Sequence, residues 1–222
     1  PPIEGRTVLK KRRYFREHYD HLRTGTMFEP RGHADMYGAV LSRSVDADFD
    51  VFFLHNEGYS TMCGHAIIAL VKLVIETGMI AGPKVTFNVP AGRVEAHATV
   101  QGGGVIAASF RNVPSFVLLR DQQVAVPGLG EVRFDVAYGG AFYAIVEAPA
   151  LGLELTAEYY DRLIDAGRRI KAAVQGSFTI EHPSEPELGF LYGTIFTGPP
   201  ADSGHHSRNV CVFAEGEVDR SA

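Results

Sequence analysis

The spacing of apolar side chains predicts several helices. From Val8 onward, apolar residues recur at helical intervals, and the basic run at residues 10–13 falls on the wet side of this amphipathic helix. Residues 156–173 show similar spacing and begin with a threonine, a favourable N-cap. Residues 66–75 are apolar nearly all round. A helix with almost no polar stripe must be enclosed on most sides, so we expect it at the centre of a domain.

Alternating apolar and polar residues predict strands around these helices, separated by Gly and Pro turns. The predicted strands are residues 36–41, 51–54, 85–89, 93–100, 105–110, 132–138, 142–146, 191–197 and 209–213. The pattern restarts near Val113, so we divide the chain into a first half, residues 1–111, and a second half, residues 112–222. Both halves have strands, a helix and further strands, which predicts an α+β fold with two similar halves.

The composition excludes several classes of protein. Hydrophobic residues make up 45% and charged residues 21% of the 222 residues, which is ordinary for a folded globular chain. The net charge of -5 argues against a nucleic-acid partner. The apolar stretch at 66–75 is far shorter than the ~20 residues that span a bilayer, so no membrane span is expected. Without a secretory signal or a disulfide framework, the chain is expected to be cytoplasmic.

Cys63 stands where a polar loop meets the apolar helix. Backbone N–H groups at a helix start and the positive end of the helix dipole favour the thiolate over the thiol. His65 is a candidate proton partner, and the N–H groups of Gly64 and His65 could bind a substrate carboxylate. Glycine has no Cβ to collide with such a ligand. The alternative is packing, which is the commoner role of a cysteine beside an apolar helix.

Other chemical candidates have weaker patterns. Cys211 lies in an apolar strand pattern, where packing is the better interpretation, and the sequence leaves a disulfide to Cys63 open. His205 and His206 are adjacent in a Gly and Ser loop, without the spaced ligand set of a metal site. The glycine-rich segments fall between strands, and no zinc, nucleophile-elbow or Walker motif is present. Hydrolase and nucleotide-dependent chemistry therefore have little support.

The residues around Cys63 resemble a known family. Residues 55–66, HNEGYSTMCGHA, are similar to the first active-site segment of the proline racemase family. Further blocks of that family are resembled in the same order by EPRGHADMYG at 29–38, NVPSF at 112–116, DVAYGGAFY at 135–143 and VDRS at 218–221. The resemblance covers nearly the whole chain.

The resemblance implies a fold and a substrate class. The family comprises proline racemases, 4-hydroxyproline epimerases and trans-3-hydroxy-L-proline dehydratases, none of which needs a cofactor such as pyridoxal phosphate or a metal. Its fold is like that of diaminopimelate epimerase: two pseudo-symmetric halves, each a curved mixed sheet or barrel around a central helix, face each other across the active-site cleft. The partner expected here is a small molecule, proline or hydroxyproline. Family members are commonly homodimers.

The resemblance also implies residue roles. Cys63 corresponds to the acid/base on one face of the substrate. Gly64 and His65 correspond to residues that contact the carboxylate, and Asp219 to the residue that binds the ring nitrogen.

The end of the sequence departs from the family pattern. Family members continue after Asp-Arg-Ser with Pro, then Cys or Thr, then Gly, whereas here Ser221 is followed by Ala222. The family's opening strand is also absent before Pro1. We therefore expect a chain truncated at both ends, which lacks the second acid/base position and is inactive as it stands.

The identity of that second position decides between reactions. Racemisation needs acid/base groups on both faces of the α-carbon, whereas dehydration needs one base, and dehydratases carry Thr there. Residues 55–66 and FLYGTI at 190–195 are closer to the dehydratase branch, which favours a hydro-lyase. The alternatives are a racemase or epimerase with two cysteines, and an inactive fragment or non-catalytic homologue.

Overall fold

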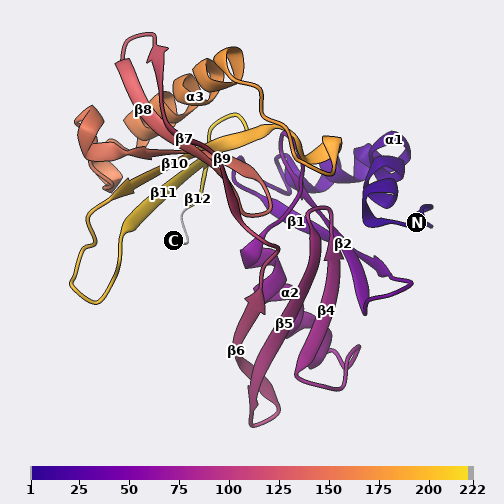
Figure 1. Ribbon diagram of the computed structural model, residues 1–222. Coiled ribbons are helices and arrows are strands. Elements are labelled where there is room, and N and C mark those ends of the chain that lie inside the picture. Colours follow the sequence, from indigo (N-terminus) through magenta and orange to yellow (C-terminus); the bar gives the residue numbers. More distant parts are fainter. Residues whose placement is uncertain (1, 220–222) are drawn as a thin grey trace. The chain divides into compact units, whose positions relative to one another are not determined.

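The computed structural model describes residues 2–219, and the chain divides into two compact units, Pro1–Pro114 and Ser115–Ala222. Each unit contains a six-stranded sheet with a helix packed on it (Figure 1). The predicted α+β class is confirmed.

The first unit forms a mixed sheet. Its elements are α1 (Val8–Met27), β1 (Tyr37–Arg43), β2 (Phe49–His55), β3 (Gly58–Ser60), α2 (Gly64–Glu76), β4 (Lys84–Val89), β5 (Gly92–Gln101) and β6 (Gly104–Arg111). The sheet order is β1-β2-β4-β5-β6, and β3 pairs with β2. β2 and β4 are parallel and are linked through β3 and α2, whereas the other pairs are antiparallel.

The second unit also contains a mixed sheet with one parallel pair of strands. Its elements are β7 (Phe116–Val126), β8 (Gly130–Tyr138), β9 (Phe142–Glu147), the 3-10 turns η1 (Ala148–Leu151) and η2 (Ala157–Tyr159), α3 (Tyr160–Ser177), the 3-10 turn η3 (Pro186–Leu188), β10 (Leu191–Gly198), β11 (Arg208–Phe213) and β12 (Glu217–Asp219). The sheet order is β12-β11-β10-β9-β8-β7. The parallel pair, β9 and β10, is linked by the segment that contains α3. Both units therefore join two adjacent parallel strands through a helix, and extend the sheet with antiparallel strands.

Helix α1 packs on the first sheet through an apolar cluster. Phe15 lies against Phe52 of β2, with ring centroids 5.3 Å apart, and Val8 and Met27 complete the cluster with Leu54. Neighbouring residues in a strand point to opposite faces. The full burial of both Phe52 and Phe53 therefore shows that β2 is covered on both sides.

One member of the basic run in α1 is not on the wet side. Lys11 is buried, and its Nζ lies 2.7 Å from Oδ2 of Asp50, itself 1% exposed. Nζ also donates to the carbonyl of Arg43. The prediction of a solvated basic face is therefore wrong at Lys11, because Asp50 on β2 offers a buried charge that must be paired.

Helix α2 is less enclosed than its sequence predicts. Ile67, Val71 and Val74 are completely buried, and α2 contacts β5 and β6. On another face Ile68 is 41% and Leu73 49% exposed. The expectation of enclosure on most sides is therefore wrong for the described residues, because the sheet of this unit covers a single face of the helix.

Helix α3 packs closely on the second sheet. A Cβ at Gly167 would lie 2.8 Å from Cβ of Val212, and Oγ1 of Thr194 donates to the carbonyl of Gly167 at 3.0 Å. The predicted helix start at Thr156 is the N-cap of the 3-10 turn η2, and α3 itself begins at Tyr160. No helix among residues 2–219 is both long and apolar enough to cross a membrane.

Candidate active site

Cys63 is the N-cap of α2. Its backbone is extended (φ -146°, ψ 110°), its Sγ accepts the N–H of Ala66 at 3.5 Å, and its carbonyl accepts the N–H of Ile67 at 3.1 Å. The predicted start of the helix at Cys63 is confirmed. A partly exposed cysteine whose sulfur receives a backbone N–H at the positive end of a helix is in surroundings that favour the thiolate.

Gly64 and His65 form the first turn of α2 after Cys63. They contribute the other N–H groups of this turn, the donors that an anion at a helix start would use. The side chain of His65 is exposed at the surface of the first unit. The structure thus brings Cys63, Gly64 and His65 together on one helix turn, while their chemical roles remain predictions.

Phe110 is a neighbour of Gly64 that the sequence does not reveal. A Cβ at Gly64 would lie 3.0 Å from Cζ of Phe110, which is tighter than an ordinary contact. Phe110 belongs to β6, next to the C-terminal end of that strand, and its strand pattern alone does not indicate which helix it meets. The lack of a side chain at Gly64 therefore leaves room for the Phe110 ring as well as for any ligand.

The segment before Cys63 is anchored on both sides. Ser60 and Thr61 are each 1% exposed. The Ser60 hydroxyl forms a hydrogen bond with the phenol of Tyr37, and the Thr61 carbonyl accepts the N–H of Ala91 at 3.1 Å. These contacts fix the path by which the chain reaches the N-cap.

Asp219 and Cys211 belong to the second unit. The backbone of Asp219 ends β12 and pairs with Cys211 of β11, but the side chain of Asp219 and residues 220–222 lie outside the part that the structure describes. The predicted contact of Asp219 with a ring nitrogen therefore stays a prediction. Neither cysteine is in a disulfide.

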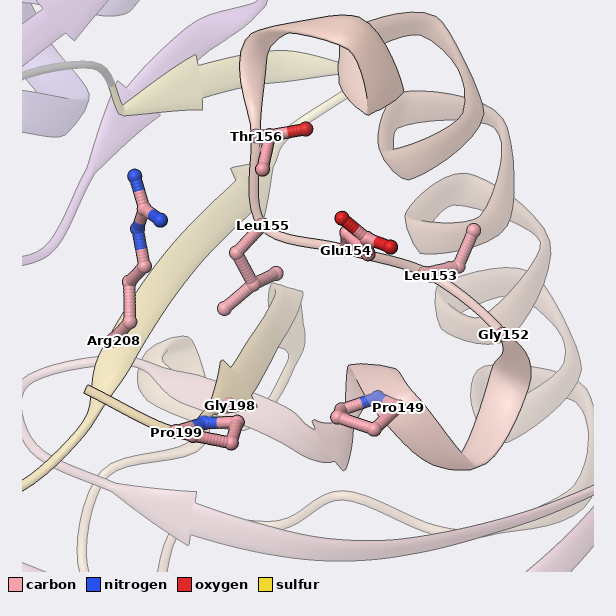
Figure 2. Close-up of a pocket in the computed structure, with 9 residues that line it drawn as sticks. All are labelled: Pro149, Gly152, Leu153, Glu154, Leu155, Thr156, Gly198, Pro199 and Arg208. Atoms are coloured by element: carbon pink, nitrogen blue, oxygen red, sulfur yellow. The ribbon is translucent and has the colours of Figure 1, made fainter. Parts of the chain in front are cut away.

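Two other features lie outside the Cys63 turn. His205 is exposed and pairs with Asp202 at 2.8 Å, and within residues 2–219 no group of His, Cys, Asp and Glu side chains is arranged to hold a metal ion. A pocket of about 410 Å³ in the second unit lies between residues 149–156 and the ends of β10 and β11 (Figure 2). Leu155 and Arg208 line it, but no predicted site residue does.

Comparison with known proteins places these features in context. Residues 1–222 match the family described as Proline racemase. A trans-3-hydroxy-L-proline dehydratase from Colwellia psychrerythraea is 50% identical over 227 residues, and one from Homo sapiens is 47% identical over 232 residues. The matches cover 100% of this chain but 64% and 66% of those proteins, so the chain spans about two thirds of the length of the curated relatives it matches.

The fold has a close counterpart among solved structures. A hydroxyproline epimerase from Agrobacterium vitis, crystallised with bound trans-4-OH-L-proline, matches with a TM-score of 0.91 and 30% sequence identity. The match covers 100% of this chain and 66% of that one.

Proposed function

Because the chain belongs to the proline racemase family, we propose that the protein dehydrates trans-3-hydroxy-L-proline to pyrroline-2-carboxylate. The observation that carries the proposal is the sulfur of Cys63 at the start of α2, within 3.5 Å of the Ala66 N–H. The identity of 50% and 47% to two dehydratases supports this reaction over the others in the family.

The reaction needs a base at the α-carbon of the substrate and hydrogen-bond donors at the carboxylate bonded to that carbon. The Cys63 thiolate takes the proton from the α-carbon, while the N–H groups of Gly64 and His65 hold the carboxylate. The electron pair of the broken C–H bond forms the double bond between C2 and C3. Hydroxide leaves C3 and is released as water after protonation, and the enamine tautomerises to the imine of pyrroline-2-carboxylate. By family resemblance, Asp219 binds the ring nitrogen.

A racemase or epimerase is the second candidate, because the Agrobacterium vitis structure that matches at a TM-score of 0.91 is a hydroxyproline epimerase. That reaction would require a second acid/base group on the opposite face of the α-carbon. A non-catalytic homologue is the third candidate.

Product analysis separates the three. Purified protein that contains this chain is incubated with trans-3-hydroxy-L-proline, L-proline or trans-4-hydroxy-L-proline, and products are followed by proton NMR. Pyrroline-2-carboxylate from the first substrate supports the proposal. Inversion at the α-carbon of the other two, without dehydration, supports the epimerase, and no turnover of any substrate supports the third candidate.

Assembly and location form a subsidiary part of the proposal. Homodimers are common in the family, which supports the same assembly here. A cytoplasmic location is proposed along with the dimer. Light scattering coupled to gel filtration measures the mass directly, and a monomer mass would contradict the dimer.

A further inference from the structure

We propose that Asp20 and Arg23 of α1 are positioning residues that fix the turn between β2 and β3 and thereby the place of Cys63. The inference rests on the proposed function, because Cys63 acts there as the base. The role of Asp20 and Arg23 is to hold the backbone that leads to Cys63.

Arg23 holds the turn through its guanidinium. Its Nη1 donates to the carbonyl of His55 at 3.0 Å and also to the carbonyl of Asn56. These two carbonyls lie where β2 ends and the turn to β3 begins. Arg23 is 8% exposed, so water cannot replace these bonds without opening the contact between α1 and the sheet.

Asp20 orients the guanidinium. Its Oδ1 accepts from Nε of Arg23 at 2.7 Å and its Oδ2 from Nη2 at 2.9 Å, a two-point contact that fixes the plane of the fork. Oδ1 also accepts the hydroxyl of Tyr59 at 2.7 Å. Since Tyr59 lies in the middle of β3, Asp20 and Arg23 together bind the hairpin at its turn and at β3.

The same turn is hydrogen-bonded to the loop between α1 and β1. The amide of Asn56 donates to the carbonyls of His33 at 2.7 Å and Ala34 at 3.1 Å. The turn that Arg23 holds therefore also fastens the loop between α1 and β1. A shift at Asn56 would move both segments together.

The path from this turn to the sulfur is short and packed. After Tyr59 the chain passes through the buried residues Ser60 and Thr61 and reaches Cys63 by way of Met62. Because this segment is short and buried, a shift of the β2–β3 hairpin would also shift the N-cap residue Cys63. A misplacement of about 1 Å in a catalytic group can cost about 100-fold in rate.

A matched pair at the other end of β2 provides the control. Lys11 of α1 and Asp50 of β2 are 2.7 Å apart, at 8% and 1% exposure, and Asn88 donates to the second oxygen of Asp50 at 2.8 Å. This ion pair also joins α1 to β2, and it is at least as buried as Asp20 and Arg23. It lies at the start of β2, whereas Arg23 binds the end that leads toward Cys63.

The test compares Asp20→Asn, Arg23→Met and Arg23→Lys with Lys11→Met and Asp50→Asn, well below the melting temperature of every variant. We expect Asp20→Asn and Arg23→Met to lower kcat by about 10- to 100-fold and to raise KM, since Cys63 and the N–H donors of Gly64 and His65 lie on one helix turn and are displaced together. Arg23→Lys restores part of kcat. The control variants melt at lower temperature but keep kcat within about twofold.

A second readout needs no substrate. The rate at which iodoacetamide alkylates Cys63, followed by peptide mass spectrometry, reports the accessibility and thiolate character of that sulfur. It should change in the Asp20 and Arg23 variants and stay at the unsubstituted rate in the controls. Equal effects of both sets on kcat and alkylation would overturn the positioning role.

If Arg23→Met does not fold, Asp20→Asn, which preserves side-chain size, decides. Lack of turnover by the unsubstituted protein would overturn the proposed function alone, because the alkylation comparison still decides the positioning role.

Discussion

The sulfur of Cys63 accepts the backbone N–H of Ala66 at 3.5 Å, so one atom both caps α2 and occupies the position proposed for the base. These two roles have different chemical requirements. A hydroxyl caps a helix well but is a far weaker base than a thiolate at neutral pH.

Cys63→Ser should therefore separate capping from catalysis. We expect turnover to fall by at least about 100-fold, the usual contribution of a positioned base, while the melting temperature stays unchanged. Cys63→Ala should lose turnover and also about 0.5–1 kcal/mol of the free energy of unfolding, because the N-cap is removed. Urea denaturation and NMR turnover assays measure the two effects. Retained turnover in the serine variant would refute the role of Cys63.

Close packing of α3 on β11 predicts a large cost for one methyl group. In Gly167→Ala, the new Cβ would meet Cβ of Val212 at 2.8 Å, and a branched side chain held in a sheet cannot yield easily. We expect the free energy of unfolding to drop by about 1–3 kcal/mol. Gly176→Ala in the same helix has no atom within 4 Å of the new Cβ and should stabilise by roughly 0.5 kcal/mol. Similar changes in both variants would contradict the close approach.

The Asp20 carboxylate predicts a dependence of stability on pH. Hydrogen bonds from Arg23 hold the pKa of Asp20 below its usual 3.8, although desolvation opposes this shift. A carboxyl whose pKa is lower in the folded state stabilises the fold above its unfolded pKa and loses this contribution as pH falls through the folded value.

Asp20→Asn should consequently lower the melting temperature at pH 7, and its difference from the unsubstituted protein should shrink below about pH 4. Asp165, paired with Arg169 on the exposed face of α3 at 2.7 Å, provides the control. Asp165→Asn is expected to change the melting temperature little at any pH, because exposed pairs contribute little. Melting curves between pH 3 and pH 7 would show a constant difference for Asp20→Asn if the inference is wrong.

Removal of the hydroxyl from two different tyrosines is expected to change the melting temperature in opposite directions. Burial raises the pKa of Tyr138 to about 12, and its hydroxyl has no hydrogen-bond partner among the residues that the structure describes. Tyr138→Phe should leave the melting temperature unchanged or raise it, since a buried hydroxyl without a partner is removed. Tyr59→Phe should lower it, because the 2.7 Å bond to Asp20 is lost. A clear destabilisation in Tyr138→Phe would contradict this prediction.

The local features of the site could be predicted from sequence. Cys63 follows a polar loop and precedes an apolar stretch that Gly78 terminates, and the structure has its helix there. Strands with regular alternation, such as Phe142–Glu147, are equally predictable. The sequence pattern does not indicate strand β7, because Asp121 has a positive φ of 54° and the register shifts around it, which breaks the alternation.

Features that depend on distant partners could not be predicted. Lys11 belongs to a basic run, and its burial follows from Asp50, which no local pattern connects to it. Phe110 beside Gly64 and the carbonyls held by Arg23 likewise join segments far apart in the chain. Sequence periodicity reports which face of an element is apolar, but it does not report which other element covers that face.

The link between β2 and β4 has a consequence for how the site comes into being. Antiparallel neighbours can form as hairpins, but these parallel strands can pair only after the intervening chain, including Cys63 and α2, has crossed over. The segment that carries Cys63 must therefore be long enough to span from the end of β2 to the start of β4 before the sheet can close. A deletion within it would oppose the pairing of Phe49 with Phe87 and of Asp50 with Asn88, so the length of this segment is set by the sheet as well as by the site.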